Sequence, residues 1–202
     1  MANAGFRKGP GSGPRPGGAR FTAGAGAHSG PLFSPAQIHH LMKTEFARAR
    51  RYGFPVACIV AQTDRMASLT DIHGVEFRDL VRSEMARVVR EKTRAADQSG
   101  WSGDDRLLVV LPHTTHEQAM AVAERIRGLF AEVVVEGLGA RVPLTLSMGV
   151  AACEDESMLF FDTILSQAEA ALQQAQEAGG NRVAGFRGGS GTGSGSPGGG
   201  VR

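Results

Sequence analysis

The apolar positions along this chain follow two periods, and each period predicts one kind of secondary structure. Helical spacing begins at Pro35, places Ile38, Met42 and Phe46 on one face, and stops before Gly53. Short apolar runs bounded by turn residues indicate buried strands instead. Together the two patterns predict helices over 35–52, 77–94, 115–130 and 164–178, and strands over 55–63, 107–111, 143–151 and 182–186.

The connecting segments carry turn signals. Residues 64–74 are interpreted as a loop, and the glycines between 100 and 103 predict a turn that makes the strand over 107–111 part of a hairpin. The sequence from Thr115 to Gln118 has the spacing of a capping box at a helix start. Strands that alternate with helices around one hairpin predict a single α/β domain, in which helices cover a mixed sheet.

The two ends of the chain differ in composition from the middle. Residues 1–34 contain no acid and are rich in glycine and proline, and residues 187–202 are rich in glycine and serine. Such segments bury too little apolar surface to fold, so we expect two disordered tails around one domain over 35–186. Six of the 22 basic residues lie in these tails, which leaves 16 against all 20 acids in the middle. A domain with a net charge of about −4 is not expected to bind nucleic acid.

Several other classes of site are not indicated. No apolar stretch approaches the ~20 residues of a membrane span, and the N-terminus lacks the apolar core of a signal peptide, so we expect a cytoplasmic protein without a membrane partner. Cys58 and Cys153 lie in or beside apolar runs, which suits buried thiols. The pair His113 and His116 spans a strand end and a helix start, so no metal site is expected there.

Five segments in a fixed order resemble the GGDEF domain, the bacterial signalling fold that joins two GTP molecules into cyclic di-GMP. They are EFARARRYGFP (45–55), IVAQTD (59–64), LPHTTHEQAMAVAERIRG (111–128), TLSMGV (145–150) and the pattern AxxALxxAxxxGxNRV (168–183). Each segment alone is a weak indication of the family, but all five occur in the family's order and spacing, and the resemblance extends over residues 32–186. The resemblance implies the mixed α/β fold of nucleotide cyclases.

The five-residue signature of that family falls on residues 103–107. The resemblance implies that Asp105 is the retained metal-binding acid, that Arg106 replaces an essential glutamate, and that Gln62 replaces the second metal-binding aspartate. Mg²⁺ is held by anionic oxygens, and a cation 4 Å from a divalent ion costs about 8 kcal/mol at an effective dielectric constant of 20. We therefore expect no cyclase activity and no cofactor, with Mg²⁺ relevant only to residual activity. We expect Arg106 to pair with Asp105 or Asp104.

The other substrate positions of the family have also changed. Phosphate-contacting and guanine-contacting side chains are replaced by Ala67, Thr70, Gln176 and Gly180, and only Asp79 matches a guanine-binding aspartate. A metal-free site in which Arg106 binds GTP phosphate is the alternative, and the loss of the other phosphate ligands argues against it.

One site of the family is retained. Arg94 and Asp97 form an RxxD motif that five residues (98–102) separate from Gly103, and Arg125 matches a second arginine of the same family site. The resemblance implies that these three residues bind cyclic di-GMP, because an arginine fork can bond guanine acceptors while an aspartate accepts from guanine N–H groups. The alternative is that Arg94 caps its helix and pairs with Asp97 on the surface. Nearby, Trp101 could stack on a base or serve as a packing anchor.

Three functions remain open on this evidence. The first is an inactive GGDEF domain that binds cyclic di-GMP and relays it to an unidentified protein partner, with a homodimer as a further possibility. The second is an interaction module that has lost nucleotide binding. The third, residual cyclase activity, would require an unusual metal site.

Overall fold

The computed structural model describes residues 32–186 apart from 104, 138–139 and 155–159. In chain order its elements are α1 (Pro35–Tyr52), β1 (Val56–Thr63), α2 (Met66–His73), α3 (Val75–Lys92), β2 (Gln98–Trp101), β3 (Arg106–Pro112), α4 (His116–Ala131), β4 (Val134–Gly137), β5 (Ala140–Pro143), β6 (Leu146–Cys153), α5 (Phe161–Glu177) and β7 (Val183–Gly185). The mixed α/β class that the sequence predicts is confirmed.

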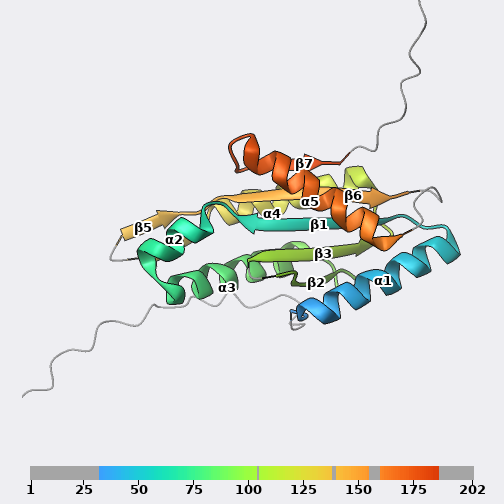
Figure 1. The fold of residues 1–202 in the computed structure, drawn as a ribbon, viewed down its shortest axis with the longest axis horizontal. Coiled ribbons are helices and arrows are strands. Elements are labelled where there is room, and N and C mark those ends of the chain that lie inside the picture. The colour runs from blue at the N-terminus through green and yellow to red at the C-terminus, as the bar shows by residue number, and fades with distance from the viewer. Residues whose placement is uncertain (1–31, 104, 138–139, 155–159, 187–202) are drawn as a thin grey trace, which may run out of the picture.

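A five-stranded mixed sheet in the order β2-β3-β1-β6-β7 forms the centre of the fold (Figure 1). β1 pairs antiparallel with both β3 and β6, whereas β7 runs parallel to β6. Alternate side chains of β1 enter two cores: Ala57 and Ile59 face α3 and α4, while Cys58 and Val60 face α1 and α5. The sheet is thus covered by helices on both faces.

Three parts of the fold differ from the sequence-based expectation. Residues 66–73 form α2 rather than a loop; only Met66 of this helix is buried, so its apolar pattern is too weak to recognise. The small hairpin of β4 and β5 was missed, and the strand expected over 143–151 begins only at Leu146. Both segments are too short to show a clear period of two.

The N-terminal boundary also needs a correction. The expected tail included residues 32–34, but Phe33 pairs with Gly100 of β2 through a parallel bridge, and Ser34 caps α1. Backbone pairing of this kind leaves no signal in composition. Residues 1–31 and 187–202 of the expected tails lie outside the described residues. No helix in the described ranges is long and apolar enough to cross a membrane.

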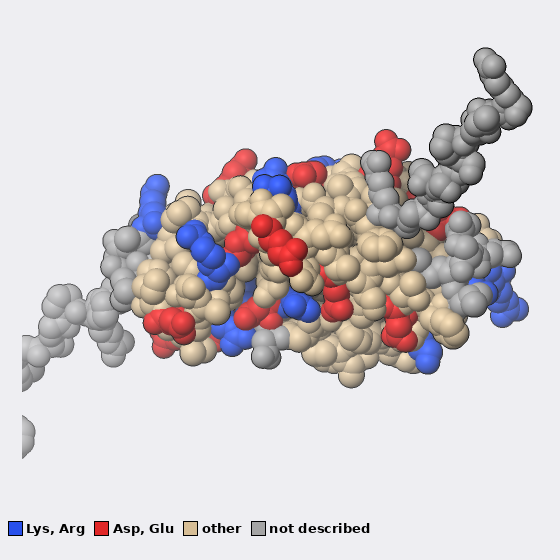
Figure 2. All heavy atoms as spheres, turned by 45° about the horizontal axis from the view of Figure 1, so that its top comes forward, with Lys and Arg blue, Asp and Glu red and all other residues tan. Residues whose placement is uncertain are grey.

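Surface charge is mixed on the face shown in Figure 2. Lysine and arginine side chains alternate there with aspartate and glutamate, and neither sign forms a continuous stripe. Nucleic-acid-binding surfaces commonly gather basic residues along one face or helix. The face in Figure 2 lacks that pattern.

Close packing of α5 on β6 depends on Gly149. A Cβ atom at this position would clash with the backbone carbonyl oxygen of Ala168 and the backbone nitrogen of Leu172. Backbone atoms of a packed helix cannot move aside alone, so the whole of α5 would have to shift. Gly149 therefore sets the distance between this helix and the sheet.

We expect Gly149→Ala to destabilise the protein by at least the 1–3 kcal/mol typical of overpacking. Gly128 of α4 is the matched control, because a Cβ there would meet no atom within 4 Å. Gly128→Ala should instead stabilise the helix by about 0.5–1 kcal/mol. Urea unfolding of the two variants and the parent measures both effects; equal midpoints for the two variants would contradict the packing argument.

Candidate functional site

Asp64 joins three segments at the end of β1. Its carboxylate accepts hydrogen bonds from Thr145 Oγ1 at 2.7 Å, Ser147 Oγ at 2.5 Å and the backbone N–H of Asn181 at 2.9 Å. These bonds tie β1 to β6 and to the turn that follows α5. The sequence did not single out Asp64 as a structural residue, because its partners lie more than 80 residues away.

Asp105, which the resemblance predicts as a metal-binding position, is bound by arginine. Arg78 Nε of α3 donates to Asp105 Oδ1 at 2.7 Å, and Arg82 Nη1 lies 3.8 Å from the same oxygen. Arg82 also stacks over the ring of Trp101, 4.1 Å from its centroid. Trp101 therefore serves as a packing partner for an arginine in this structure. The carboxylate faces two cations where a metal would have to bind.

Arg106 contacts neither of the acids that the sequence suggested. Its Nη1 lies 3.6 Å from Glu169 Oε1 of α5, so the expected pair with Asp105 is wrong, and Asp104 lies outside the described residues. The cause is side-chain alternation at the start of β3. Residues 105 and 106 point to opposite faces of the sheet, one toward α3 and the other toward α5.

Gln62 lies directly opposite Arg106 in the pairing of β1 with β3. Its Oε1 accepts a hydrogen bond from Gln176 Nε2 at 3.1 Å. A cavity of about 380 Å³ opens here between Arg106 and one face of α5. Its described polar residues are Arg106, Ser166, Glu169, Gln173 and Gln176, so the lining carries one charge of each sign.

These groups do not fit Mg²⁺. The ion requires near-octahedral coordination by hard oxygens, usually with one or two carboxylates. Asp105 is bound by two arginines, and Gln62 offers only an amide that is already hydrogen-bonded to Gln176. Within the described ranges, no cluster of three or more histidine, cysteine, aspartate or glutamate residues could hold a metal.

Of the other predicted substrate positions, Gln176 lines that cavity, whereas Asp79 and Thr70 do not. Asp79 is exposed and lines a different cavity of about 510 Å³, together with Arg82 and Trp101. Thr70 donates its hydroxyl to the Met66 carbonyl oxygen of its own helix at 2.8 Å. The two arginines that bind Asp105 belong to the same helix as Asp79. Asp79 and Arg106 therefore line two different cavities.

The RxxD motif forms a compact turn between α3 and β2. The Arg94 backbone N–H donates to Asp97 Oδ2 at 2.7 Å, and the Asp97 backbone N–H donates to the Arg94 carbonyl oxygen at 3.0 Å. Asp97 thus bonds the backbone of Arg94, while the guanidinium has no hydrogen-bond or ion-pair partner among the described residues. Burial raises the pKa of the Asp97 carboxyl above its ordinary value of 3.8, and the hydrogen bond and charge of Arg94 offset part of this rise.

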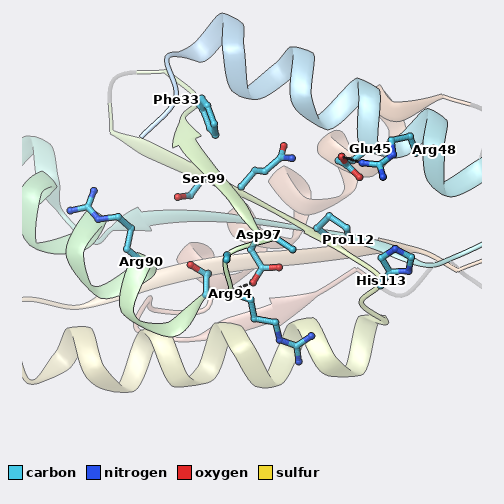
Figure 3. A pocket seen from close by; sticks show the side chains of 13 residues that line it. Phe33, Glu45, Arg48, Arg90, Arg94, Asp97, Ser99, Pro112 and His113 are labelled. Atoms are coloured by element: carbon cyan, nitrogen blue, oxygen red, sulfur yellow. Dashed lines mark hydrogen bonds and ion pairs between the residues drawn. The ribbon is translucent and has the colours of Figure 1, made fainter. Parts of the chain in front are cut away.

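A cavity of about 550 Å³ lies beside this turn (Figure 3). Its walls come from α1, the end of α3, the start of β2 and the end of β3. Arg90 and Arg94 extend from the end of α3 in opposite directions, and Asp97 lies near the middle of the view. Arg125 is exposed on α4 and does not line the cavity. The structure brings two of the three predicted binding residues together.

Sequence analysis missed Glu45, which lines the same cavity from α1. It is only 6% exposed and lies in the helical period of the buried residues Ile38, Met42 and Ala49. An acid at a core position of an amphipathic helix was the signal that could have identified it, because buried charges normally need a partner.

Comparison with known proteins identifies the family to which this fold belongs. The family model described as "Diguanylate cyclase, GGDEF domain" matches residues 32–182. Diguanylate cyclase DgcM of Escherichia coli is 30% identical over 152 residues, which is 75% of this chain and 34% of that protein. Diguanylate cyclase A of Treponema denticola is 30% identical over 128 residues, which is 63% of this chain and 34% of the length of that protein. This chain therefore spans about a third of the length of these relatives.

Solved structures show the same fold. The active GGEEF domain of a Vibrio cholerae diguanylate cyclase superposes with a TM-score of 0.73 at 25% identity, covering 79% of this chain and all of that one. The GGDEF domain of DgcB from Caulobacter crescentus, solved with cyclic di-GMP, gives a TM-score of 0.73 at 18% identity, covering 83% and 98%.

Proposed function

Because the chain belongs to the GGDEF domain family of diguanylate cyclases, we propose that it is an inactive member that binds cyclic di-GMP and relays it to a protein partner. The proposed ligand site comprises Arg94, Asp97 and Arg125. We place this function in the cytoplasm and propose that it requires no metal.

The ion pair between Arg78 and Asp105 is the observation that carries the proposal of inactivity. Phosphoryl transfer depends on a metal that neutralises the triphosphate and the developing charge. Here the acid that would hold the metal is bound at 2.7 Å by a guanidinium, and Arg106 stands where the family has an acid. A site so rich in cations repels a divalent ion, although it does not by itself exclude an anionic ligand.

We expect the purified protein to form no cyclic di-GMP from GTP with Mg²⁺ or Mn²⁺. Arg106→Glu alone should not restore turnover, because Arg78 still binds Asp105 and Gln62 still lacks a carboxylate. Chromatographic detection of cyclic di-GMP measures turnover by the parent and by Arg106→Glu. GTP-dependent product that disappears in Asp105→Ala would show that the chain is an enzyme.

The support for ligand binding comes from the RxxD turn. The turn holds its own shape through two hydrogen bonds that involve Asp97, and these leave the guanidinium of Arg94 available. An arginine can bond the O6 and N7 acceptors of guanine in a bidentate manner, and a carboxylate can accept from its N–H groups. The DgcB domain of the same fold was solved with cyclic di-GMP, which is consistent with this ligand.

A protein partner is the other half of the proposal. The diguanylate cyclase SiaD of Pseudomonas aeruginosa, whose structure was solved with its activator SiaC, has the same fold at a TM-score of 0.71 and 24% identity. A fold that accommodates a protein partner in one case is compatible with such a role here. The ligand could also dock between two copies of this chain, with Arg125 of α4 completing the contact.

One observation favours the second candidate, an interaction module that binds no nucleotide. Arg125 does not line the cavity beside the RxxD turn, so the three predicted residues do not form one closed pocket. On that hypothesis the turn between α3 and β2 is structural, and Arg94 is a solvated side chain.

Titration with cyclic di-GMP distinguishes the two candidates. We expect micromolar affinity, about −8 kcal/mol, and a loss of about 5- to 150-fold in Arg94→Ala, since one bidentate contact contributes about 1–3 kcal/mol. Arg125→Ala should also weaken binding. Thr70→Ala is the control, because that hydroxyl bonds its own helix. If saturating ligand gives no heat of binding, or if Arg94→Ala binds with the affinity of the parent, the interaction module is favoured.

Repeating the titration at several protein concentrations reveals whether binding is linked to dimerisation.

The affinity should also depend on pH through Asp97. An ionised carboxylate accepts N–H bonds more strongly than the protonated group, which gives up part of its acceptor capacity to its own O–H, and burial raises the pKa of this group above 3.8. Binding is therefore complete above the raised pKa and weakens as the pH falls through it, at a higher pH than for an ordinary aspartate. Calorimetry over a descending pH series measures this effect. Asp97→Asn should lose the dependence and Asp79→Asn should keep it; an identical profile in Asp97→Asn would assign the dependence to another group.

A further inference from the structure

The cavity beside the RxxD turn extends beyond Arg94 and Asp97. These two residues contribute only one side of its volume of about 550 Å³, while Glu45 and Arg48 of α1 form another (Figure 3). Gln98, the first residue of β2, also lines it. The wall opposite the turn therefore has chemical groups of its own.

Glu45 leaves one oxygen of a buried carboxylate without a donor. The residue is 6% exposed, and its Oε1 accepts from Arg48 Nη1 at 2.7 Å. Among the described residues Oε2 has no hydrogen-bond partner. Oε2 is not one of the fully buried atoms without a partner, so water reaches it and a donor group of a ligand can replace that water. The cavity is the direction from which that donor can come.

A second acceptor of the same cavity lacks a partner. Gln98 Oε1 is buried, and no group in the described part of the chain donates to it. The terminal torsion of a glutamine amide is broad, so a rotation can turn this oxygen toward the cavity at low cost. Glu45 and Gln98, which line the same cavity, thus each supply an acceptor oxygen that has no donor among the described residues.

Positively charged side chains also line the cavity that holds these acceptors. Arg48, Arg90 and Arg94 all line the cavity, and the Arg48 side chain is 58% exposed. Phe33 and Pro112 add apolar faces. A ligand that fits this arrangement carries anionic groups toward the arginines, a flat ring, and an edge of N–H donors that reaches Glu45. Bases are commonly bound by stacking on aromatic rings and by hydrogen bonds to their Watson–Crick edge.

We propose that Glu45, assisted by Gln98, receives the N1–H and N2–H edge of a guanine base and so selects guanine over adenine. This inference rests on the proposed function and adds the base-reading residues of that site. A carboxylate accepts both adjacent guanine donors, whereas the same edge of adenine presents an acceptor at N1 that repels it. Arg94 keeps its proposed contact with the O6 and N7 acceptors of guanine, and Arg48 and Arg90, which line the same cavity, are available to the phosphates.

The test compares cyclic di-GMP with cyclic di-AMP by calorimetry on the parent and on Glu45→Gln. The amide keeps the size of the side chain and an acceptor for Arg48, but it loses the charge. We expect the parent to prefer cyclic di-GMP, and Glu45→Gln to lose about 5- to 150-fold of that affinity with an equal fall in the guanine preference. Glu91→Gln is the matched control, because Glu91 lies on α3, pairs with Arg87 at 3.2 Å and does not line the cavity.

The outcomes separate the two proposals. If the parent binds neither dinucleotide, both the proposed function and this inference fail. If the parent binds cyclic di-GMP but shows no preference over cyclic di-AMP, or if Glu45→Gln keeps the preference of the parent, only the role of Glu45 is overturned. If Glu45→Gln shows no thermal unfolding transition, and so does not fold, Glu45→Asp is tested in its place. This variant keeps the charge but shortens the side chain by one methylene. Its preference for guanine over adenine should again be lower than that of the parent.

Discussion

The burial of β1 on both faces is the constraint on which the rest of this structure depends. Its side chains enter two separate cores, and its backbone pairs antiparallel with β3 on one side and β6 on the other. Such a strand has no freedom to slip, because a shift by one residue would exchange the side chains of the two cores. The register places Gln62 opposite Arg106 and Ser147, and thereby determines which groups meet at this end of the sheet.

Alternation at the start of β3 then decides the electrostatics around Asp105 and Arg106. Asp105 and Arg106 are neighbours in the chain, yet the strand directs them to opposite faces. Each finds a partner of opposite charge on a different helix: Asp105 on α3 and Arg106 on α5. Partly exposed pairs of this kind contribute only about 0–1 kcal/mol to stability. Their greater effect is chemical, since they occupy the positions where carboxylates would be needed to hold a metal.

The opposite end of β3 borders a cavity that has kept a different chemistry. A local turn presents Arg94 and Asp97, and α1 adds Glu45 from a core position of its apolar face. Neither part is sufficient alone: the turn supplies a cation and an acceptor, and the helix supplies the buried acceptor that can discriminate between bases. On the proposed function, one end of the sheet has lost a nucleotide site and the other end has kept one.

The sequence by itself determined the elements that follow from local periodicity. Helices α1, α3, α4 and α5 and the strand β1 could be identified without coordinates, because period, caps and residue type are local properties. The resemblance to the family, not periodicity, led to the hypothesis that Gln62 and Arg106 replace catalytic acids. Side-chain partners could not. Arg106 was expected to pair with an adjacent acid, and only the sheet revealed that its neighbour faces the other way. Glu45 and Arg78 became part of a site solely because helices distant in the chain pack against the same strands, which no local pattern encodes.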